Sequence, residues 1–497
     1  MSNITYQSEF AVIPKGKTAS PLIKNIIPGK SKKTDSIKSA IINSELKDGM
    51  TISFHHHFRS GDYVLNDVLE IISEMGYKDL ILASSSLSDI HEPLIKHINS
   101  GVIKEIHTSG LRGKLAQEIS EGVMDNPVII RSHGGRARAI EAGDIKIDVA
   151  FIGVPSTDDY GNANGQNGQA VCGSLGYALV DAKHADHVVL ITDHLVEYPN
   201  TPASISQKNV DQVVVVDRIG ASERIASGAT RFTKNPKELL IAKNASEMII
   251  NSPYFKDGFS FQTGSGGSSL AVTRFLREAM IKENIKASFA LGGITKPMVE
   301  LHEEGLIKQL FDVQSFDLDA AKSISDNKNH HEIDASLYAN PHNKGCMTNQ
   351  LNVVILSALE IDTSFNVNVI TGSDGKFMGA SGGHCDTAAC ADLTVIVAPL
   401  IRGRIPTVVK AVDTIITPGT SVDILVTERG IAINPKRTDL VECFKDSTLN
   451  IIPIETLENM ANQIVGPKKP IEHTEKIVGL VEYRDGSIID VIRAVKS

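Results

Sequence analysis

The sequence lacks the features that mark a membrane, secreted or nucleic-acid-binding protein. No apolar run approaches the ~18–20 residues that a membrane span requires, and no basic segment followed by an apolar core opens the chain. The five cysteines are odd in number and widely spaced, unlike a disulfide framework. A formal net charge of −9 argues against a nucleic-acid-binding surface as the main role. We therefore expect a cytoplasmic protein with no membrane or nucleic-acid partner.

The composition favours a large α/β protein. A chain of 497 residues is too long for one hydrophobic core, and its 39 glycines indicate many tight turns. Residues 1–40, rich in lysine and proline, predict an extended N-terminal arm that lies on a domain or on a partner subunit. The alternative is a docking arm for a carrier protein.

From residue 50 onward, short apolar runs alternate with amphipathic stretches of helical length. The runs are β-branched and bounded by Gly, Pro, Ser or Asn, which is typical of strands buried on both faces. The pattern predicts mostly parallel sheets with helical crossovers. The strands expected in the first half span residues 50–54, 80–83, 103–107, 128–131, 148–153, 188–192 and 212–216.

An internal repeat divides the chain. Four blocks that begin at Ser53, Gly101, Asp148 and Ala185 recur in the same order in the second half. The recurrences begin at Ser260, Gly305, Asn352 and Ala391. We expect two homologous α/β domains, residues 41–245 and 246–497, with the ligand between them at strand carboxyl ends.

Three turns that follow predicted strands carry the candidate chemistry. Glycine turns let a ligand approach the backbone, and the N–H groups at a helix start favour anions. The first turn holds Gly264, Gly266 and Gly267, in a spacing that does not fit a dinucleotide fold. The second turn holds Gly382 and Gly383, next to a His384-Cys385 pair that gives only weak grounds for a thiol nucleophile. The third turn is the arginine-glycine run of residues 131–136.

Basic and imidazole side chains at these turns suit an anionic substrate. His55, His57 and Arg59 follow the first strand, and a metal is disfavoured because no further ligand lies nearby in the sequence. Arg131, His133 and Arg136 follow another strand, and arginine binds carboxylates with two parallel bonds. Buried structural histidines and surface arginines remain open alternatives.

Three long segments resemble the citrate lyase alpha subunits of the coenzyme A transferase superfamily. They span residues 55–66, 131–143 and 381–386. Residues 262–267 and 422–432 are similar to the wider superfamily. The resemblance implies two tandem coenzyme A transferase-like domains. It also implies exchange of acetyl for citryl on a carrier thioester, with release of acetate, as part of ATP-independent citrate cleavage.

The resemblance also implies partners, ligands and roles. The chain would act with a citrate lyase β subunit and an acyl carrier (γ) subunit in a larger complex, as a homo-oligomer. It would use the carrier's phosphopantetheine-type thioester, or acetyl-CoA in its place, with no tightly bound cofactor. The residues that would line the thioester and its oxyanion are Gly264, Gly266, Gly267, Gly292, Gly293, Gly382 and Gly383. The residues that would bind citrate are His55, His57, Arg59, Arg131, His133 and Arg136.

One departure from the superfamily bears on mechanism. Covalent transferases keep a nucleophilic glutamate that would fall on Leu291 or Gly292, beside Gly293, and neither position offers a carboxylate. This disfavours a covalent acetate-type transferase or an acyl-CoA hydrolase. A citramalate lyase alpha subunit and a non-catalytic scaffold subunit remain as alternatives, and the glycine spacing disfavours a dinucleotide oxidoreductase.

Overall fold

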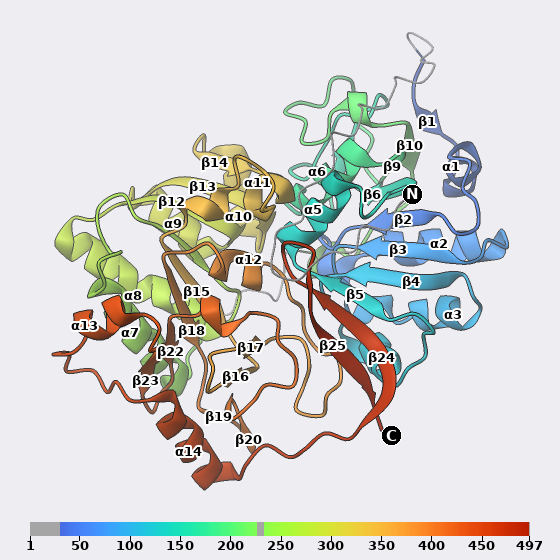
Figure 1. Ribbon diagram of the computed structural model, residues 1–497. Helices are drawn as coiled ribbons and strands as arrows, with labels where there is room; N and C mark the ends of the chain where they lie inside the picture. The colour runs from blue at the N-terminus through green and yellow to red at the C-terminus, as the bar shows by residue number, and fades with distance from the viewer. Residues whose placement is uncertain (1–29, 226–232, 497) are drawn as a thin grey trace.

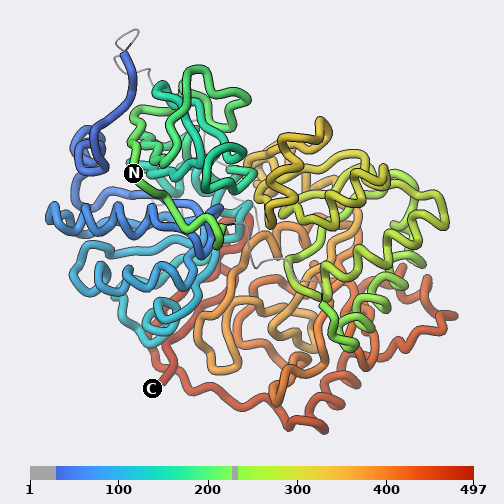
Figure 2. Tube along the Cα trace, turned by 180° about the vertical axis from the view of Figure 1, so that it is seen from behind, coloured from blue at the N-terminus to red at the C-terminus, as the bar shows by residue number. Residues whose placement is uncertain are grey.

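The computed structural model describes residues 30–225 and 233–496. They form two halves, each centred on a mostly parallel sheet with helices packed on it (Figure 1). From behind, the two halves lie side by side, and the C-terminal segment returns to the first half (Figure 2).

Sheet 1 forms the first half, with strand order β1-β10-β9-β6-β2-β3-β4-β5-β24-β25. All neighbouring strands are parallel except β24 and β25. The strands are β1 (Lys33–Thr34), β2 (Thr51–Phe54), β3 (Leu80–Ser84), β4 (Ile103–Thr108), β5 (Val128–Arg131), β6 (Val149–Gly153), β9 (His187–Thr192), β10 (Gln212–Val215), β24 (His473–Glu482) and β25 (Ile488–Val495).

Sheet 2 forms the second half, with strand order β14-β13-β12-β11-β15-β18-β22-β23. Here only β22 and β23 are antiparallel. The strands are β11 (Ser260–Thr263), β12 (Ala287–Ile294), β13 (Ile307–Ser315), β14 (His330–Glu332), β15 (Val353–Ser357), β18 (Leu393–Val397), β22 (Ile424–Val426) and β23 (Ile431–Ile433).

The two sheets share one topology. The run β10-β9-β6-β2-β3-β4-β5 in sheet 1 corresponds to β22-β18-β15-β11-β12-β13-β14 in sheet 2. The repeated blocks lie on equivalent strands: Ser53 on β2 and Ser260 on β11, for example. The predicted α/β class with two tandem, mostly parallel sheets is confirmed.

The loops that follow β6 and β15 each carry one aspartate and two asparagines at matching positions, and both loops are structural turns. Asp158 accepts hydrogen bonds from the backbone of Tyr160 and Asn162, and Asp362 does the same for Ser364 and Asn366. Each loop carries a short antiparallel pairing, β7 (Ser156–Thr157) with β8 (Ala163–Asn164) and β16 (Glu360–Asp362) with β17 (Val367–Asn368). Turn chemistry therefore accounts for these polar residues.

Helices cover both sheets. They are α1 (Ile37–Asn43), α2 (Val64–Glu74), α3 (Leu94–Asn99), α4 (Gly113–Ser120), α5 (His133–Ala142), α6 (Gly176–His184), α7 (Pro236–Ile250), α8 (Gly267–Glu283), α9 (Lys296–Glu303), α10 (Leu318–Asp326), α11 (Ala335–Ala339), α12 (His384–Ala388), α13 (Thr438–Cys443) and α14 (Ile454–Val465). The helix α5 packs against α11 of the other half, and α6 packs against α11 and β13.

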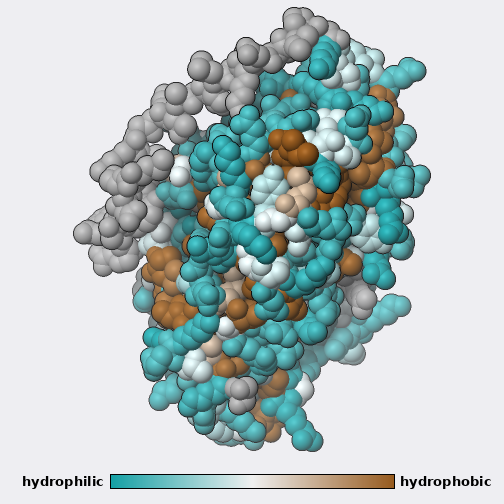
Figure 3. Space-filling view, turned by 90° about the vertical axis from the view of Figure 1, so that its right-hand side faces the viewer, coloured by the Kyte–Doolittle hydropathy of each residue, from teal (hydrophilic) through white to brown (hydrophobic). Residues whose placement is uncertain are grey.

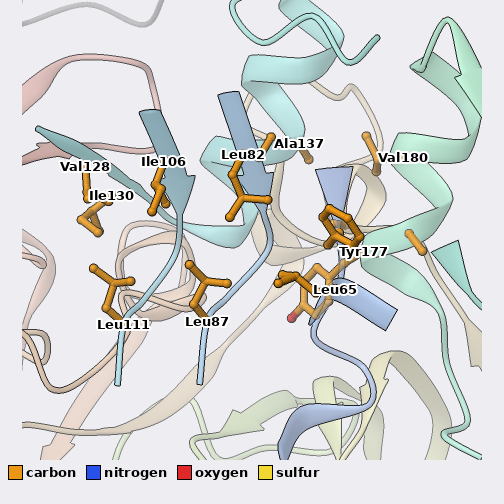
Figure 4. Packing of buried hydrophobic residues seen from close by; sticks show 14 of the residues in the cluster. Leu65, Leu82, Leu87, Ile106, Leu111, Val128, Ile130, Ala137, Tyr177 and Val180 are labelled. Carbon is orange, nitrogen blue, oxygen red and sulfur yellow. The ribbon is translucent and has the colours of Figure 1, made fainter. Parts of the chain in front are cut away.

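Branched aliphatic side chains on adjacent strands build the core of the first half. Figure 4 shows Leu82, Ile106, Val128 and Ile130, from three adjacent strands, beside Leu87 and Leu111. All six are at most 1% exposed, as strands covered on both faces require. This packing holds the carboxyl ends of the strands in fixed positions.

The two chain ends add features beyond the repeat. Residues 1–29 of the predicted arm lie outside the described residues. The rest of the predicted arm is built into the first half, because β1 pairs with β10 and α1 buries Ile37, Ala40 and Ile41. The strand β24 pairs with β5, so residues 473–495 extend sheet 1 although they follow sheet 2 in the chain. The division at residue 245 stays a prediction.

Polar residues dominate the face seen in Figure 3, with smaller apolar patches between them. Within residues 30–225 and 233–496, no helix is both long and apolar enough to cross a membrane.

Candidate functional site

The two halves meet where several strands end. His56 follows β2, His133 follows β5, and Phe316 follows β13 of the other half. Contacts join the halves here: the His133 N–H donates to Gly382 O at 2.8 Å, and the Gln314 amide donates to His56 O at 3.3 Å. We call the residues gathered here the interface cluster: His56, Arg59, His133, Tyr177, Gln262, Gly292, Gly293, Phe316, Tyr338, Gly382 and Gly383.

Three stacked rings form the first-half side of the cluster. The His56 ring lies 5.4 Å from that of His133 and 4.8 Å from that of Tyr177, and His133 and Tyr177 are 4.3 Å apart. Burial and the nearby Arg136 lower the pKa of His133 to about 3. Burial, followed by the charges of His133 and Arg59, holds the pKa of His56 well below its usual value. Both imidazoles are therefore neutral at pH 7 and offer hydrogen bonds rather than charge.

Arg59 supplies positive charge to the cluster. Its backbone is left-handed, with φ 54°, which is uncommon for a residue with a side chain. The guanidinium lies 4.5 Å from the Phe316 ring centre and donates one bond, 3.3 Å long, to Ser315 O. Its buried Nε has no hydrogen-bond partner among the residues that the structure describes. Burial lowers the pKa of Arg59 to about 10, so the group stays charged at neutral pH with an unused donor.

Gly292 and Gly293 lie at a bulge in the pairing of β12 with β13. Gly292 has φ +99°, and a Cβ there would lie 2.7 Å from Gln262 Cδ. A Cβ on Gly293 would lie 2.4 Å from the Phe316 ring. The space that a side chain at residue 292 would need is therefore filled by the Gln262 amide, which donates to Tyr338 Oη at 2.8 Å.

Gly382 and Gly383 stand at the start of α12, between His133 and Tyr338. Gly382 has φ +55°, and a Cβ on Gly383 would lie 2.5 Å from Tyr338 Oη. The Asp386 carboxylate fixes this turn to α5, because it accepts from Ser132 Oγ at 2.7 Å and from the Gly134 N–H at 2.8 Å. The glycine turn and the first turn of α5 are thus held as one unit.

The glycine turn before α8 adjoins the same unit. Gly264, Gly266 and Gly267 are half-buried, and a Cβ on Gly266 would lie 2.5 Å from Ser357 Oγ. The adjacent His384 contacts Ser357 O through Nε2 at 3.0 Å. The two glycine turns are therefore connected through Ser357 and His384.

Four predicted citrate-binding residues lie elsewhere, in contacts within the protein. Arg136 makes two bonds of 2.7 Å to the buried Asp181, and His55 Nε2 lies 3.0 Å from the same carboxylate. His57 contacts Gly153 O at 2.8 Å. The Arg131 guanidinium binds Glu482 of β24 through two bonds of 2.8 Å. Of the six predicted residues, the structure brings only Arg59 and His133 to the interface cluster.

The cluster also holds residues that sequence reasoning missed. The one sequence signal for His56 is alternation along a strand, which places it opposite His55 and His57. Gln262 stood at the start of a recognised glycine motif. Tyr177, Phe316 and Tyr338 gave no local signal, because only the tertiary fold brings them to the strand ends.

The burial of Cys385 does not favour this residue as a nucleophile. Burial raises the pKa of this thiol to about 12, which leaves almost no thiolate at neutral pH. Among the described residues, no group of three His, Cys, Asp or Glu side chains could hold a metal ion.

A cavity of about 380 Å³ opens elsewhere on the second half. It is lined by Pro236, Lys237, Leu240, Ile401, Glu428, Arg429 and Ile464. None of these residues belongs to the interface cluster.

The fold recurs in another solved structure. The alpha subunit of a malonate decarboxylase from Acinetobacter baumannii shares the fold, with a TM-score of 0.66 at 14% identity over 88% of each chain. At this level of identity the likeness shows a shared fold.

Closer relatives define the family. The family model "Citrate lyase, alpha subunit (CitF)" matches residues 30–495. Citrate lyase alpha chains from Escherichia coli and Haemophilus influenzae are 58% and 56% identical, over 93% and 99% of this chain and 90% and 97% of theirs. A Streptococcus mutans protein described as the alpha subunit of citrate lyase, solved with citrate, is 61% identical with a TM-score of 0.96 and covers 98% and 96%. The chain belongs to the citrate lyase alpha subunit family, as its motifs indicated.

Proposed function

We propose that this chain exchanges acetyl for citryl on the thioester of an acyl carrier subunit, without a covalent intermediate on an enzyme carboxylate. The observation that carries this proposal is the absence of a carboxylate at Leu291 and Gly292, where the Gln262 amide fills the space. Since leucine and glycine have no nucleophile, a carboxylate of the substrate takes that role.

The exchange takes two steps. A carboxylate oxygen of citrate attacks the acetyl carbonyl, and the thiolate leaves, which gives a mixed citric–acetic anhydride. The thiolate then attacks the citryl carbonyl of the anhydride and acetate departs with the bridging oxygen. One thioester replaces another, so no ATP is needed, and positioning with oxyanion stabilisation supplies the catalysis.

The interface cluster suits both substrates. The Arg59 guanidinium, with its unpaired Nε, binds a carboxylate of citrate, and the neutral His56 and His133 donate hydrogen bonds to it. The turns at Gly264, Gly266, Gly267, Gly382 and Gly383 let the thioester arm approach the backbone. His55, Arg131 and Arg136 support this site from within the first half through their contacts with the Asp181 and Glu482 carboxylates.

The resemblance supplies the biological setting of the proposal. The thioester belongs to an acyl carrier subunit, and a β subunit cleaves the citryl thioester to oxaloacetate and the acetyl thioester. The three chains act together in the cytoplasm, with several copies of this chain in the complex.

Incubation of the purified chain with acetyl-CoA and citrate tests the proposal. We expect citryl-CoA and acetate by mass spectrometry, only when both substrates are present. Acetate without citrate would make the chain a hydrolase and contradict the proposal. Absence of both products, with acetyl-CoA and with the acetylated carrier subunit, would also contradict it, and citramalate in place of citrate tests the alternative acid.

A further inference from the structure

Gln262 and Tyr338 form a buried polar pair that the transfer chemistry leaves unused. The Gln262 side chain lies at the end of β11, and the residue is 6% exposed. Its Nε2 donates to Tyr338 Oη, whereas its Oε1 is buried and accepts no hydrogen bond from residues 30–225 and 233–496. A buried acceptor without a partner is costly, so such an atom in a site points to a ligand donor.

The pair stands where the reaction would occur. Gln262 fills the space beside Gly292, and Tyr338 Oη abuts Gly383. These glycines belong to two of the turns that would surround the thioester. Burial raises the pKa of Tyr338, so its hydroxyl stays protonated and retains a proton to donate after accepting from Gln262.

We propose that Gln262 determines specificity for a hydroxy acid by accepting a hydrogen bond from the hydroxyl group of the substrate at Oε1. Citrate at neutral pH carries three carboxylates and one hydroxyl, and only the hydroxyl can donate to an amide oxygen. A carboxylate placed there would face the amide oxygen without a proton between them. The Tyr338 hydroxyl donates to a neighbouring carboxylate oxygen of the same substrate, which completes a donor–acceptor pair.

This inference rests on the proposed transferase function and adds a substrate preference to it. A site that hydrogen-bonds a substrate hydroxyl rejects the analogue that lacks it, because the buried partner is left unpaired. Tricarballylate is citrate without the hydroxyl and keeps the three carboxylates. We expect the wild-type chain to prefer citrate over tricarballylate in kcat/KM by about 10-fold or more.

The test compares the two acids in the wild-type chain and in Gln262→Met, a variant of similar volume. The ratio of kcat/KM for citrate to that for tricarballylate should fall at least about 5-fold in the variant, since the acceptor is gone. Gln309→Met serves as the control: this half-buried glutamine of β13 contacts His331 at 2.6 Å, outside the interface cluster, and its ratio should match the wild-type ratio.

Two outcomes would overturn the inference. One is a Gln262→Met ratio equal to that of the wild type, and the other is a loss confined to KM for acetyl-CoA, which would assign Oε1 to the thioester arm. If Gln262→Met does not fold, Gln262→Leu takes its place. The thermal stabilisation that citrate and tricarballylate each give to the protein then provides the same comparison. A wild-type chain that forms no citryl thioester would instead refute the proposed function.

Discussion

Replacement of Arg59 by methionine tests the assignment of the citrate-binding charge. The Nε of the guanidinium is buried, yet in the part of the chain that the structure describes the guanidinium makes one hydrogen bond, of 3.3 Å, to Ser315 O. Removal of one partner of a buried, hydrogen-bonded charge pair costs about 2–5 kcal/mol. At about 1.4 kcal/mol per tenfold, kcat/KM for citrate should fall by about 30-fold or more. The cation–π contact with Phe316 contributes about 2 kcal/mol to folding stability.

Arg136→Met provides the matched contrast. This change removes the guanidinium that donates to both oxygens of Asp181, and it leaves that carboxylate buried. Burial raises the pKa of Asp181, but the charges of Arg136 and His55 outweigh it and lower that pKa. We expect a loss of about 3–5 kcal/mol in unfolding free energy, read from urea titration. An Arg59→Met chain with unchanged citrate dependence would refute the reasoning.

Two further predictions concern stability. Burial lowers the pKa of His384 to about 4, against 6.5 for the unfolded chain, so between these values only the unfolded chain binds the proton. The free energy of unfolding should therefore fall as pH decreases from 6.5 toward 4, by up to about 1.4 kcal/mol per pH unit. Urea unfolding at pH 7.5 and 5.5 should show a smaller difference for His384→Gln, and an equal difference would contradict the assignment. Gly292→Ala should lower both stability and activity, because the new Cβ meets the Gln262 amide at a positive φ. Gly143→Ala, also at positive φ but with no described residue within 4 Å of the new Cβ, should cost only about 1–2 kcal/mol and leave activity intact. Equal activity of the two variants would count against the role of the Gly292 space.

The repeat and the strand periodicity made the architecture predictable. β-branched runs bounded by turn residues predicted β5 with its observed bounds, and β2 and β6 to within one residue. The matched blocks on β2 and β11 correctly indicated two sheets of one topology. Strand periodicity and the matched blocks can each be recognised in short stretches of sequence, without knowledge of tertiary contacts.

The side chains of the site were less predictable, because their partners are distant in sequence. Glu482, which binds Arg131, lies 351 positions further along the chain. The strand that carries it, β24, joins sheet 1 from the far end of the sequence. An arginine beside a glycine turn therefore gives the same local sequence pattern whether it binds a substrate or an internal carboxylate. Tyr338, in turn, meets Gln262 only through the packing of α11.

The most direct test of the central claim follows one oxygen atom. Citrate labelled with oxygen-18 in its carboxylates is mixed with the acetyl thioester and the chain under single-turnover conditions, and the acetate is analysed by mass spectrometry. Direct attack by the substrate predicts acetate that carries one labelled oxygen, because the bridging oxygen of the anhydride leaves with it. Unlabelled acetate in the first turnover would show that an enzyme carboxylate or water had attacked, and would contradict the account.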